Sequence, residues 1–328
     1  MPVAVVAIGG NSLIKDEKHP SLAGEIEALR ETSTHIAAML SQGWDIVLTH
    51  GNGPQVGFNL LRSELAAKVA PPLPLDVLGA QTQGSIGYLI QQVLGNELRA
   101  RQIRKRIATV VTQTVVDRHD PAFHRPTKPI GRFYEKDEAE RLQAERGWQM
   151  VEDAGRGWRR VVPSPMPLEI VERLIIKGLV FQSIVVIAAG GGGIPVVRRP
   201  DGALEGVEAV IDKDLASSLL AQSIGADLLL ISTAVERVAL HYGRPEERAL
   251  DRITVADAKH YLSQGHFPPG SMGPKILAAI QFVEATGGEA LITSPEHIPA
   301  ALAGRTGTRI TGGDGLQMEG RNHGPATR

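Results

Sequence analysis

Short apolar runs alternate along the chain with longer amphipathic stretches. The apolar runs are of strand length and end in glycine or polar turn residues; they cover residues 3–8, 45–50, 107–116, 183–189, 227–233 and 289–294. The intervening stretches repeat their apolar residues with the period of a helix, over residues 21–42, 82–103, 167–177, 214–224, 255–263 and 275–285. This alternation predicts an α/β protein with a mostly parallel central sheet covered by helices.

Residues 117–167 interrupt this alternation, since they are rich in proline and charge and lack the apolar runs. We interpret them as an inserted subdomain that protrudes from the sheet, with Trp148 and Trp158 in a small local core; an unstructured excursion is the alternative. Residues 1–312 then form one domain that includes the insertion. Residues 313–328 have no periodicity and are expected to be a flexible tail.

Composition excludes several classes of protein. The chain of 328 residues is 42% hydrophobic and 22% charged, with a net charge of −1, so it offers no global attraction for nucleic acid or acidic membranes. It has no cysteine, which excludes a disulfide framework, a thiolate metal site and a cysteine nucleophile. The N-terminal residues lack the features of a secretory signal or a membrane span, so we expect a cytoplasmic location.

Three glycine-rich loops each follow a predicted strand. They comprise Gly9, Gly10 and Asn11; Gly51, Asn52 and Gly53; and the run Gly190, Gly191, Gly192 and Gly193. Ligands bind at the carboxyl ends of parallel strands, and backbone amides and helix N-termini there host oxyanions. The loops therefore predict one anion site, although each could be only a tight turn. None matches a P-loop, and the first loop also fails the G-x-G-x-x-G dinucleotide pattern.

Three lysines stand at predicted turns or helix starts: Lys128, Lys213 and Lys275. Solvated surface positions are the alternative for each of them. Asp212 and Asp214 flank Lys213 and could orient the lysines or hold Mg²⁺. The alternative for both aspartates is that they cap the N-terminus of the helix that follows, a role that Asp214 could also combine with the first. Lysines combined with backbone amides suit phosphoryl transfer, which depends on positioning and charge stabilisation.

The chain resembles the carbamate kinases of the amino acid kinase superfamily in "AIGGNSL", "HGNGPQVG", "PTKPIG", "EDAGRGWRRVVPSP", "GVEAVIDKDLAS" and "GHFPPGSMGPK". The resemblance implies a three-layer α/β/α sandwich with a protruding subdomain over the active site, and a homodimer. It also implies reversible, Mg²⁺-dependent phosphoryl transfer between ATP and carbamate, giving ADP and carbamoyl phosphate and often run toward ATP synthesis.

The resemblance assigns roles residue by residue. Lys128, Lys213 and Lys275 would contact the transferred phosphoryl group, and Asp212 or Asp214 would organise them or the metal. The first two glycine loops would bind carbamate through backbone amides, and glycines 190–193 would complete that pocket because side chains there would stand in the substrate's place. Nucleotide contacts are assigned to Lys213, Thr233, Ala234, Val238, Met272 and Lys275, with backbone contacts expected around Ala234, where some relatives have aspartate.

Two alternatives remain open at this point. Another acid kinase of the superfamily, such as an acetylglutamate or glutamate kinase, is disfavoured because "VVAIGGN" has no first-strand lysine and no arginine lies in the glycine loops. A catalytically silent nucleotide-binding regulator is disfavoured because binding alone does not require three lysines aimed at a transferred group. Turnover distinguishes these readings.

Overall fold

The computed structural model of the chain describes residues 1–9, 21–153 and 155–313. Its central sheet has the strand order β15-β17-β16-β12-β1-β2-β9-β3. The strands are β1 (Val3–Ile8), β2 (Asp45–His50), β3 (Ile107–Thr109), β9 (Val185–Ile187), β12 (Leu228–Ser232), β15 (Arg252–Thr254), β16 (Glu289–Thr293) and β17 (Thr308–Thr311). Only the β16–β17 pair is antiparallel in this sheet, which confirms the mostly parallel sheet.

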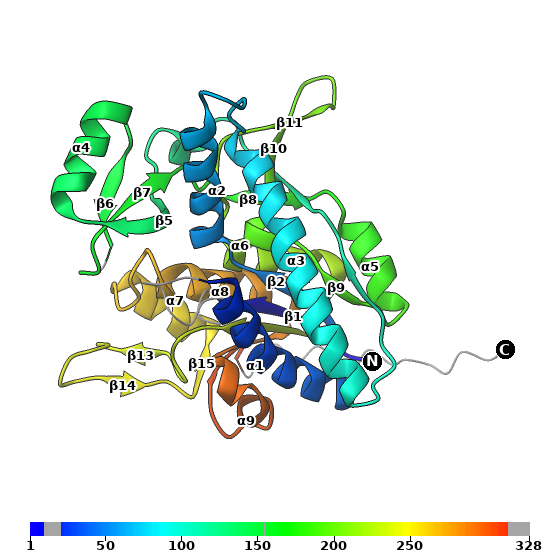
Figure 1. Cartoon of the computed structure of the whole chain (residues 1–328). Coiled ribbons are helices and arrows are strands. Elements are labelled where there is room, and N and C mark those ends of the chain that lie inside the picture. The colour runs from blue at the N-terminus through cyan, green and yellow to red at the C-terminus, as the bar shows by residue number, and fades with distance from the viewer. Residues whose placement is uncertain (10–20, 154, 314–328) are drawn as a thin grey trace.

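Helices cover both faces of this sheet (Figure 1). On β1, Val5 and Ala7 belong to one hydrophobic cluster, whereas Val6 and Ile8 belong to the cluster on the opposite face. Because both faces are buried, the strand is apolar throughout. One face is covered by α1 (Leu22–Ser41), α3 (Leu75–Ala100) and α9 (Ile298–Leu302), and the other by α5 (Arg173–Phe181), α6 (Lys213–Ile224), α7 (Val255–Ser263) and α8 (Met272–Thr286). No helix in these described ranges is long and apolar enough to cross a membrane.

Residues 107–116 form two strands and not the single strand predicted from their apolar run. After β3 the chain leaves the central sheet, and β4 (Gln113–Val116) joins a second sheet with the order β11-β10-β4-β8. Thr112 marks the break: its hydroxyl donates to the Val110 carbonyl at 2.7 Å and its amide donates to Gln83 at 2.8 Å. Side-chain hydrogen bonds therefore replace the strand ladder at this point.

Residues 167–177 are not one helix, as their spacing had predicted. The first part forms strand β8 (Pro167–Ile170), which pairs antiparallel with β4, and α5 begins only at Arg173. A short apolar run cannot distinguish helix from strand by its period alone. The second sheet is completed by β10 (Ile194–Arg198) and β11 (Leu204–Gly206), and a small hairpin joins β13 (Ala239–Leu240) to β14 (Arg248–Ala249).

The proline-rich insertion contains its own small sheet and helix. Strands β5 (Lys128–Tyr134), β7 (Trp158–Val162) and β6 (Met150–Glu152) pair antiparallel in the order β5-β7-β6, and α4 (Lys136–Arg146) lies between β5 and β6 in the chain. These elements stand apart from the central sheet at the upper left of Figure 1. Trp148 is buried with Tyr134, Leu142 and Met150, and Trp158 packs against them. The two tryptophans thus contribute to a local core.

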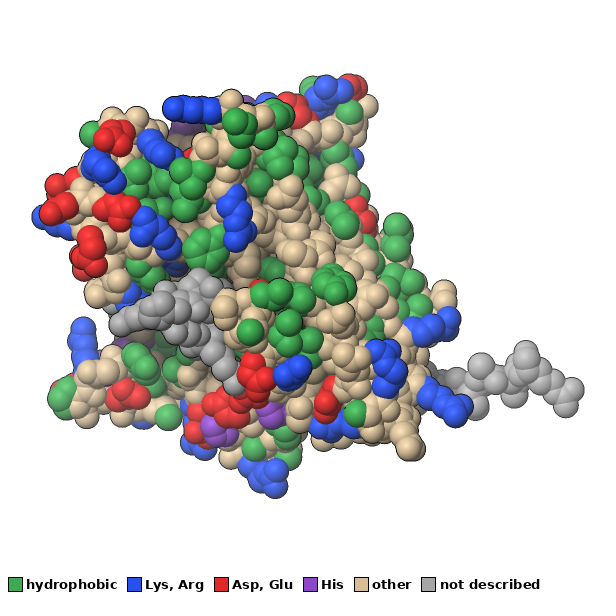
Figure 2. Space-filling model, in the orientation of Figure 1, with side chains coloured by type: hydrophobic (Ala, Val, Ile, Leu, Met, Phe, Trp, Pro, Cys, Tyr) green, Lys and Arg blue, Asp and Glu red, His purple; other side chains and the backbone are tan. Residues whose placement is uncertain are grey.

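The small sheet is seated on helix α2 (Gly53–Ala66). Gly57 of α2 lies so close to Gly131 of β5 that a Cβ at Gly57 would overlap the Gly131 backbone. Further along α2, Glu64 forms ion pairs with Arg160 at 2.7 Å and Arg146 at 3.1 Å. Charged side chains of both signs are interspersed over this upper-left lobe (Figure 2). Backbone contact and ion pairs together set the position of β5 and β7 against α2.

We predict that Gly57→Ala destabilises the protein by about 1–3 kcal/mol, because the added methyl group forces two backbones apart. Gly79→Ala in α3 is the matched control, since no described atom lies within 4 Å of a Cβ there and alanine favours a helix over glycine by about 0.5–1 kcal/mol. Urea unfolding measures both. Equal stability of Gly57→Ala and the wild type would contradict the contact.

Candidate active site

The ends of adjacent parallel strands bring the glycine loops together. β2 lies between β1 and β9 in the sheet, and a cavity of about 290 Å³ opens at this edge. Gly51, Asn52, Gly53 and Gly191 line it. The remaining predicted glycines that the structure describes, Gly9, Gly190, Gly192 and Gly193, are not among the described residues lining the cavity. Gly10 and Asn11 lie outside the described residues, as do residues 314–328 of the predicted tail.

The four-glycine run is required by protein packing. Gly191, Gly192 and Gly193 have positive φ angles of 65°, 92° and 90°, which glycine adopts without strain. A Cβ at Gly190 would overlap the His50 ring, one at Gly191 would overlap the Asn52 side chain, and one at Gly193 would overlap Thr114. We expected a substrate to exclude side chains here. Protein atoms already exclude them, and the role of this run in a substrate pocket stays a prediction.

Some of the backbone amides predicted to bind substrate are already engaged. The Gly51 amide donates to the Ile8 carbonyl at 3.2 Å, and the amides of Gly192 and Gly193 donate within their own turn at 3.0 and 3.1 Å. Helix α2 begins at Gly53, and the first amides of a helix have no intrahelical acceptor. The start of α2 is therefore the part of this loop where we predict that an anion binds.

The side chain of Gln83 in α3 forms hydrogen bonds that fix the start of the glycine run. Its side-chain nitrogen donates to the carbonyls of Thr112 and Gly190 at 3.0 and 3.1 Å, and its oxygen accepts from the Thr112 amide at 2.8 Å. Thr114 adds a hydrogen bond to the Gly192 carbonyl at 2.9 Å. These residues were not predicted from the sequence. Their only signal is polarity inside otherwise apolar segments, such as the threonines of "TVVTQTVV".

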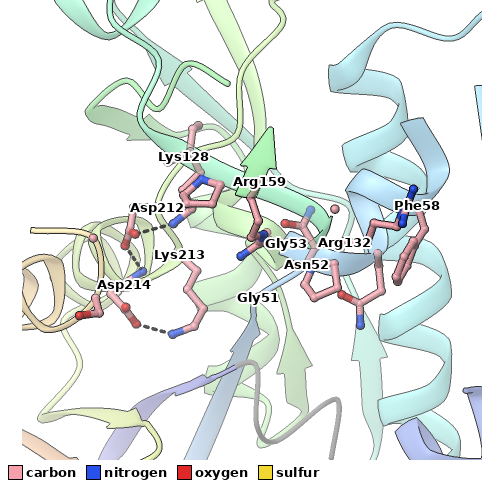
Figure 3. Close-up of a pocket in the computed structure, with 18 of the residues that line it drawn as sticks. Gly51, Asn52, Gly53, Phe58, Lys128, Arg132, Arg159, Asp212, Lys213 and Asp214 are labelled. Atoms are coloured by element: carbon pink, nitrogen blue, oxygen red, sulfur yellow. Dashed lines mark hydrogen bonds and ion pairs between the residues drawn. The ribbon is translucent and has the colours of Figure 1, made fainter. Parts of the chain in front are cut away.

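The three predicted lysines and two predicted aspartates meet in the cavity (Figure 3). Lys128 Nζ donates to Asp212 Oδ2 at 2.7 Å, and Lys275 Nζ donates to Asp214 Oδ2 at 2.8 Å. Lys213 pairs with the other oxygen of Asp214. The lysines come from β5, α6 and α8, three elements that are distant in the sequence. Three lysines face two aspartates here, and three arginines also line the cavity. Positive charge is therefore in excess, and the cavity favours an anion.

The two aspartates have different structural roles. Asp212 is the N-cap of α6, where its Oδ1 accepts from the Asp214 amide at 2.9 Å and the Leu215 amide at 3.4 Å. Asp214 does not cap the helix, contrary to the alternative considered above; its side chain is 4% exposed and both oxygens pair with lysines. One carboxylate thus ties Lys128 to the helix start, and the other joins Lys213 to Lys275.

Burial and ion pairing compete over the protonation of these groups. Burial by itself raises the pKa of both aspartates, but the neighbouring lysines outweigh it, so the pKa values of Asp212 and Asp214 are lowered. Burial lowers the pKa of Lys213, and the charge of Lys275 adds to this effect. For Lys275 the pairing with Asp214 outweighs burial and raises the pKa. The carboxylates are therefore ionised at neutral pH.

The sequence model of the Amino acid kinase family matches residues 2–294. The chain belongs to the amino acid kinase family. Within it, the chain is 54% identical to the carbamate kinase-like protein YahI of Escherichia coli, over 94% of this chain and 98% of that protein. It is 49% identical to the carbamate kinase of Thermococcus kodakarensis, over 94% of this chain and 99% of that relative. In this family the chain groups with the carbamate kinases.

Solved structures agree with this assignment. Two structures of the carbamate kinase of Giardia lamblia, one bound to citric acid and one bound to AMP-PNP, match with TM-scores of 0.90 and 0.86. Each is 44% identical and covers 94% of this chain and 98% of the neighbour. The three-layer α/β/α amino acid kinase fold predicted from the sequence is thereby confirmed.

The remaining nucleotide positions predicted for an amino acid kinase lie outside the cavity lining. Thr233 and Ala234 follow β12, and Thr233 lies beside Gly9. Val238 is buried in the core and its amide donates to Thr308 at 2.8 Å, and Met272 begins α8. None of these four is among the described residues that line the cavity. Their role in nucleotide binding stays a prediction.

Sequence analysis also missed an arginine at the glycine loops. Arg159 of β7 lines the cavity, and its Nη2 lies 3.9 Å from the position of a Cβ on Gly53. It belongs to the quoted block "EDAGRGWRRVVPSP", but nothing in the sequence indicates that this block reaches the loop at residues 51–53. Folding of the insertion onto α2 brings the two together.

We predict that His50 makes the protein acid-sensitive. Its Nδ1 donates to the Gly51 carbonyl at 3.0 Å, and burial lowers its pKa from 6.5 to about 4. The unfolded chain therefore binds the proton more tightly, so stability falls as the pH drops from about 6.5 to 4. This one group should cost about 2 kcal/mol at pH 5 and about 3 kcal/mol at pH 4.

The matched variant is His50→Asn, which keeps a side-chain donor but does not titrate in this range. Urea unfolding at pH 7.5, 6 and 5 should show a steeper loss of stability for the wild type than for the variant. Parallel pH profiles would show that His50 is protonated normally in the folded protein.

Proposed function

We propose that the chain is a carbamate kinase. It catalyses the reversible transfer of a phosphoryl group between ATP and carbamate, forming ADP and carbamoyl phosphate. The observation that carries this proposal is the meeting of Lys128, Lys213 and Lys275 with two ionised aspartates beside the start of α2. Carbamate kinases about half identical over nearly the whole chain support it.

The two sides of the cavity suit different parts of the reaction. Carbamate binds at the start of α2, where helix amides favour an oxyanion. ATP or ADP approaches from the side of α6 and α8, which supply Lys213 and Lys275. Binding of AMP-PNP by the Giardia lamblia enzyme supports this nucleotide assignment. Lys128, from the inserted sheet, closes the remaining side over the transferred group.

In the forward direction a carbamate oxygen attacks the γ-phosphorus of ATP. An O–P bond forms, the bond to the bridging oxygen breaks, and its electron pair leaves with ADP. The transition state is loose and spreads negative charge over the moving group. No proton transfer is required in this step, so the lysines act by position and charge, and Asp212 and Asp214 hold them in place.

The proposed cofactor is Mg²⁺, which neutralises nucleotide phosphate charge when bound. Within the described part of the chain no group of three or more His, Asp or Glu side chains is arranged to hold a metal. The acidic residues among the described cavity-lining residues are Asp212 and Asp214, and both pair with lysines. This fits an ion held mainly by phosphates and water, with at most one or two carboxylates.

We further propose a homodimer located in the cytoplasm. Helix α5 exposes Leu174, Ile175 and Phe181, the last at 92%. An apolar group of this kind on a helix favours burial against a second protein surface. Sedimentation of the purified chain tests the proposal, and a monomer at micromolar concentration would contradict it.

We predict that the protein forms ATP rapidly from ADP and carbamoyl phosphate with Mg²⁺, and that Lys128→Ala lowers kcat at least about 100-fold, as expected for loss of a charge-stabilising donor. Lys136→Ala is the matched control, because this lysine of the same insertion is 68% exposed and pairs only weakly with Glu140, at 3.8 Å. A coupled ATP assay measures turnover, and circular dichroism checks folding.

Absence of ATP formation by a folded wild type that still binds ADP would remove the carbamate kinase assignment and favour a regulatory role. Normal turnover in Lys128→Ala would instead leave the reaction in place and remove the role of this lysine. The assay repeated with ATP and N-acetylglutamate or glutamate as acceptor should show no turnover above background; efficient use of either would assign another acid kinase.

A further inference from the structure

Arg159 lines the cavity near the start of α2, where carbamate is proposed to bind. Its side chain is 12% exposed, and Figure 3 shows it between the Lys128–Asp212 pair and Gly53. Its Nη2 would stand 3.9 Å from a Cβ on Gly53, the first residue of α2. The guanidinium thus reaches the helix start at which carbamate is proposed to bind.

Among the described residues, Asp153 and Phe133 contact this guanidinium. Nη1 pairs with Asp153 Oδ2 at 3.1 Å, and the guanidinium carbon lies 5.2 Å from the centre of the Phe133 ring. The Asp153 amide donates to the Gly157 carbonyl at 2.8 Å, which closes the turn that leads into β7. A side chain oriented in advance loses less entropy when it binds a ligand.

The chemistry of arginine suits this place. A guanidinium presents a planar set of donors that matches a carboxylate or phosphate in two parallel hydrogen bonds, which an ammonium group cannot do. Carbamoyl phosphate carries both a planar carbamoyl group and a phosphate. Lys213 and Lys275 share Asp214, whereas the guanidinium of Arg159 comes within 4 Å of a Cβ on Gly53, the first residue of α2.

We propose that Arg159 binds carbamate and carbamoyl phosphate directly, and that Asp153 positions Arg159; this inference rests on the proposed function. Arg159 and Lys128 both belong to the β5–β7 pair, in which Lys128 is paired with Val162. The inserted sheet therefore supplies one cation to the transferred phosphoryl group and another to its acceptor. Seating of this sheet on α2 sets the positions of both.

The test compares Arg159→Met, which keeps much of the aliphatic stem but removes the charge, with Arg159→Lys. We expect kcat/KM for carbamoyl phosphate to fall about 10- to 100-fold in Arg159→Met, as for loss of a charged substrate contact, while KM for ADP changes less than about twofold. Arg159→Lys should recover only part of the loss. The control is Arg118→Ala, an exposed arginine of the same insertion that pairs with Glu205.

Asp153→Asn tests the positioning role. It should raise KM for carbamoyl phosphate less than Arg159→Met does. The loss in the double variant should be smaller than the sum of the two single losses, because without Arg159 the Asp153 carboxylate keeps only its pair with Arg156, at 3.3 Å. Fully additive losses would show that Asp153 acts independently. Thermal unfolding of each variant restricts the comparison to folded proteins. If Arg159→Met does not fold, Arg159→Lys, which keeps the positive charge, takes its place in the comparison with the wild type.

Calorimetric titration with carbamoyl phosphate separates this inference from the proposed function. If the wild type binds carbamoyl phosphate and Arg159→Met does not, but no ATP forms, the result would support the binding role of Arg159 and contradict the proposed kinase activity. Normal turnover by the wild type and by Arg159→Met, or an equal loss toward ADP and carbamoyl phosphate, would overturn the role of Arg159 alone. Neither binding nor turnover by the wild type would overturn both.

Discussion

Like charges repel strongly in a partly buried cavity, so three lysines can share this site only because two aspartates compensate them. Asp214 joins Lys213 to Lys275, and Asp212 joins Lys128 to the start of α6. The lysines come from three separate parts of the chain, and each must arrive at the same place for these ion pairs to form. Correct folding of the central sheet, the insertion and α8 is therefore coupled to the electrostatics of the site.

Helix α2 connects the two sides of this arrangement. Its first residue is the end of the loop at residues 51–53, and its body carries the inserted sheet through Gly57 and Glu64. A displacement of the inserted sheet would move Lys128 and Arg159 together, away from the loop at residues 51–53. The close backbone contact at Gly57 leaves little room for such a displacement, so this loop, α2 and the insertion form one packed unit.

Much of the fold followed from the pattern of apolar residues. The bounds of β1, β2 and α7 coincide with the predicted segments, because strands buried on both faces and amphipathic helices leave unambiguous periods. The predictions for residues 107–116 and 167–177 were wrong. The first segment is interrupted at Thr112, whose amide donates to the side chain of Gln83 in α3. The second begins as a strand because it pairs with β4. The spacing of apolar residues carries no information about either contact.

The sequence by itself determined the fold class, the five charged residues of the site and the resemblance to a family, since each is written in local spacing or in short continuous blocks. Only the tertiary structure decided which oxygen pairs with which lysine, why glycines 190–193 must lack side chains, and that Arg159 reaches Gly53. The reason is physical. Contacts between residues far apart in the chain depend on how the helices and strands pack against one another. No short stretch of sequence contains both partners of such a contact.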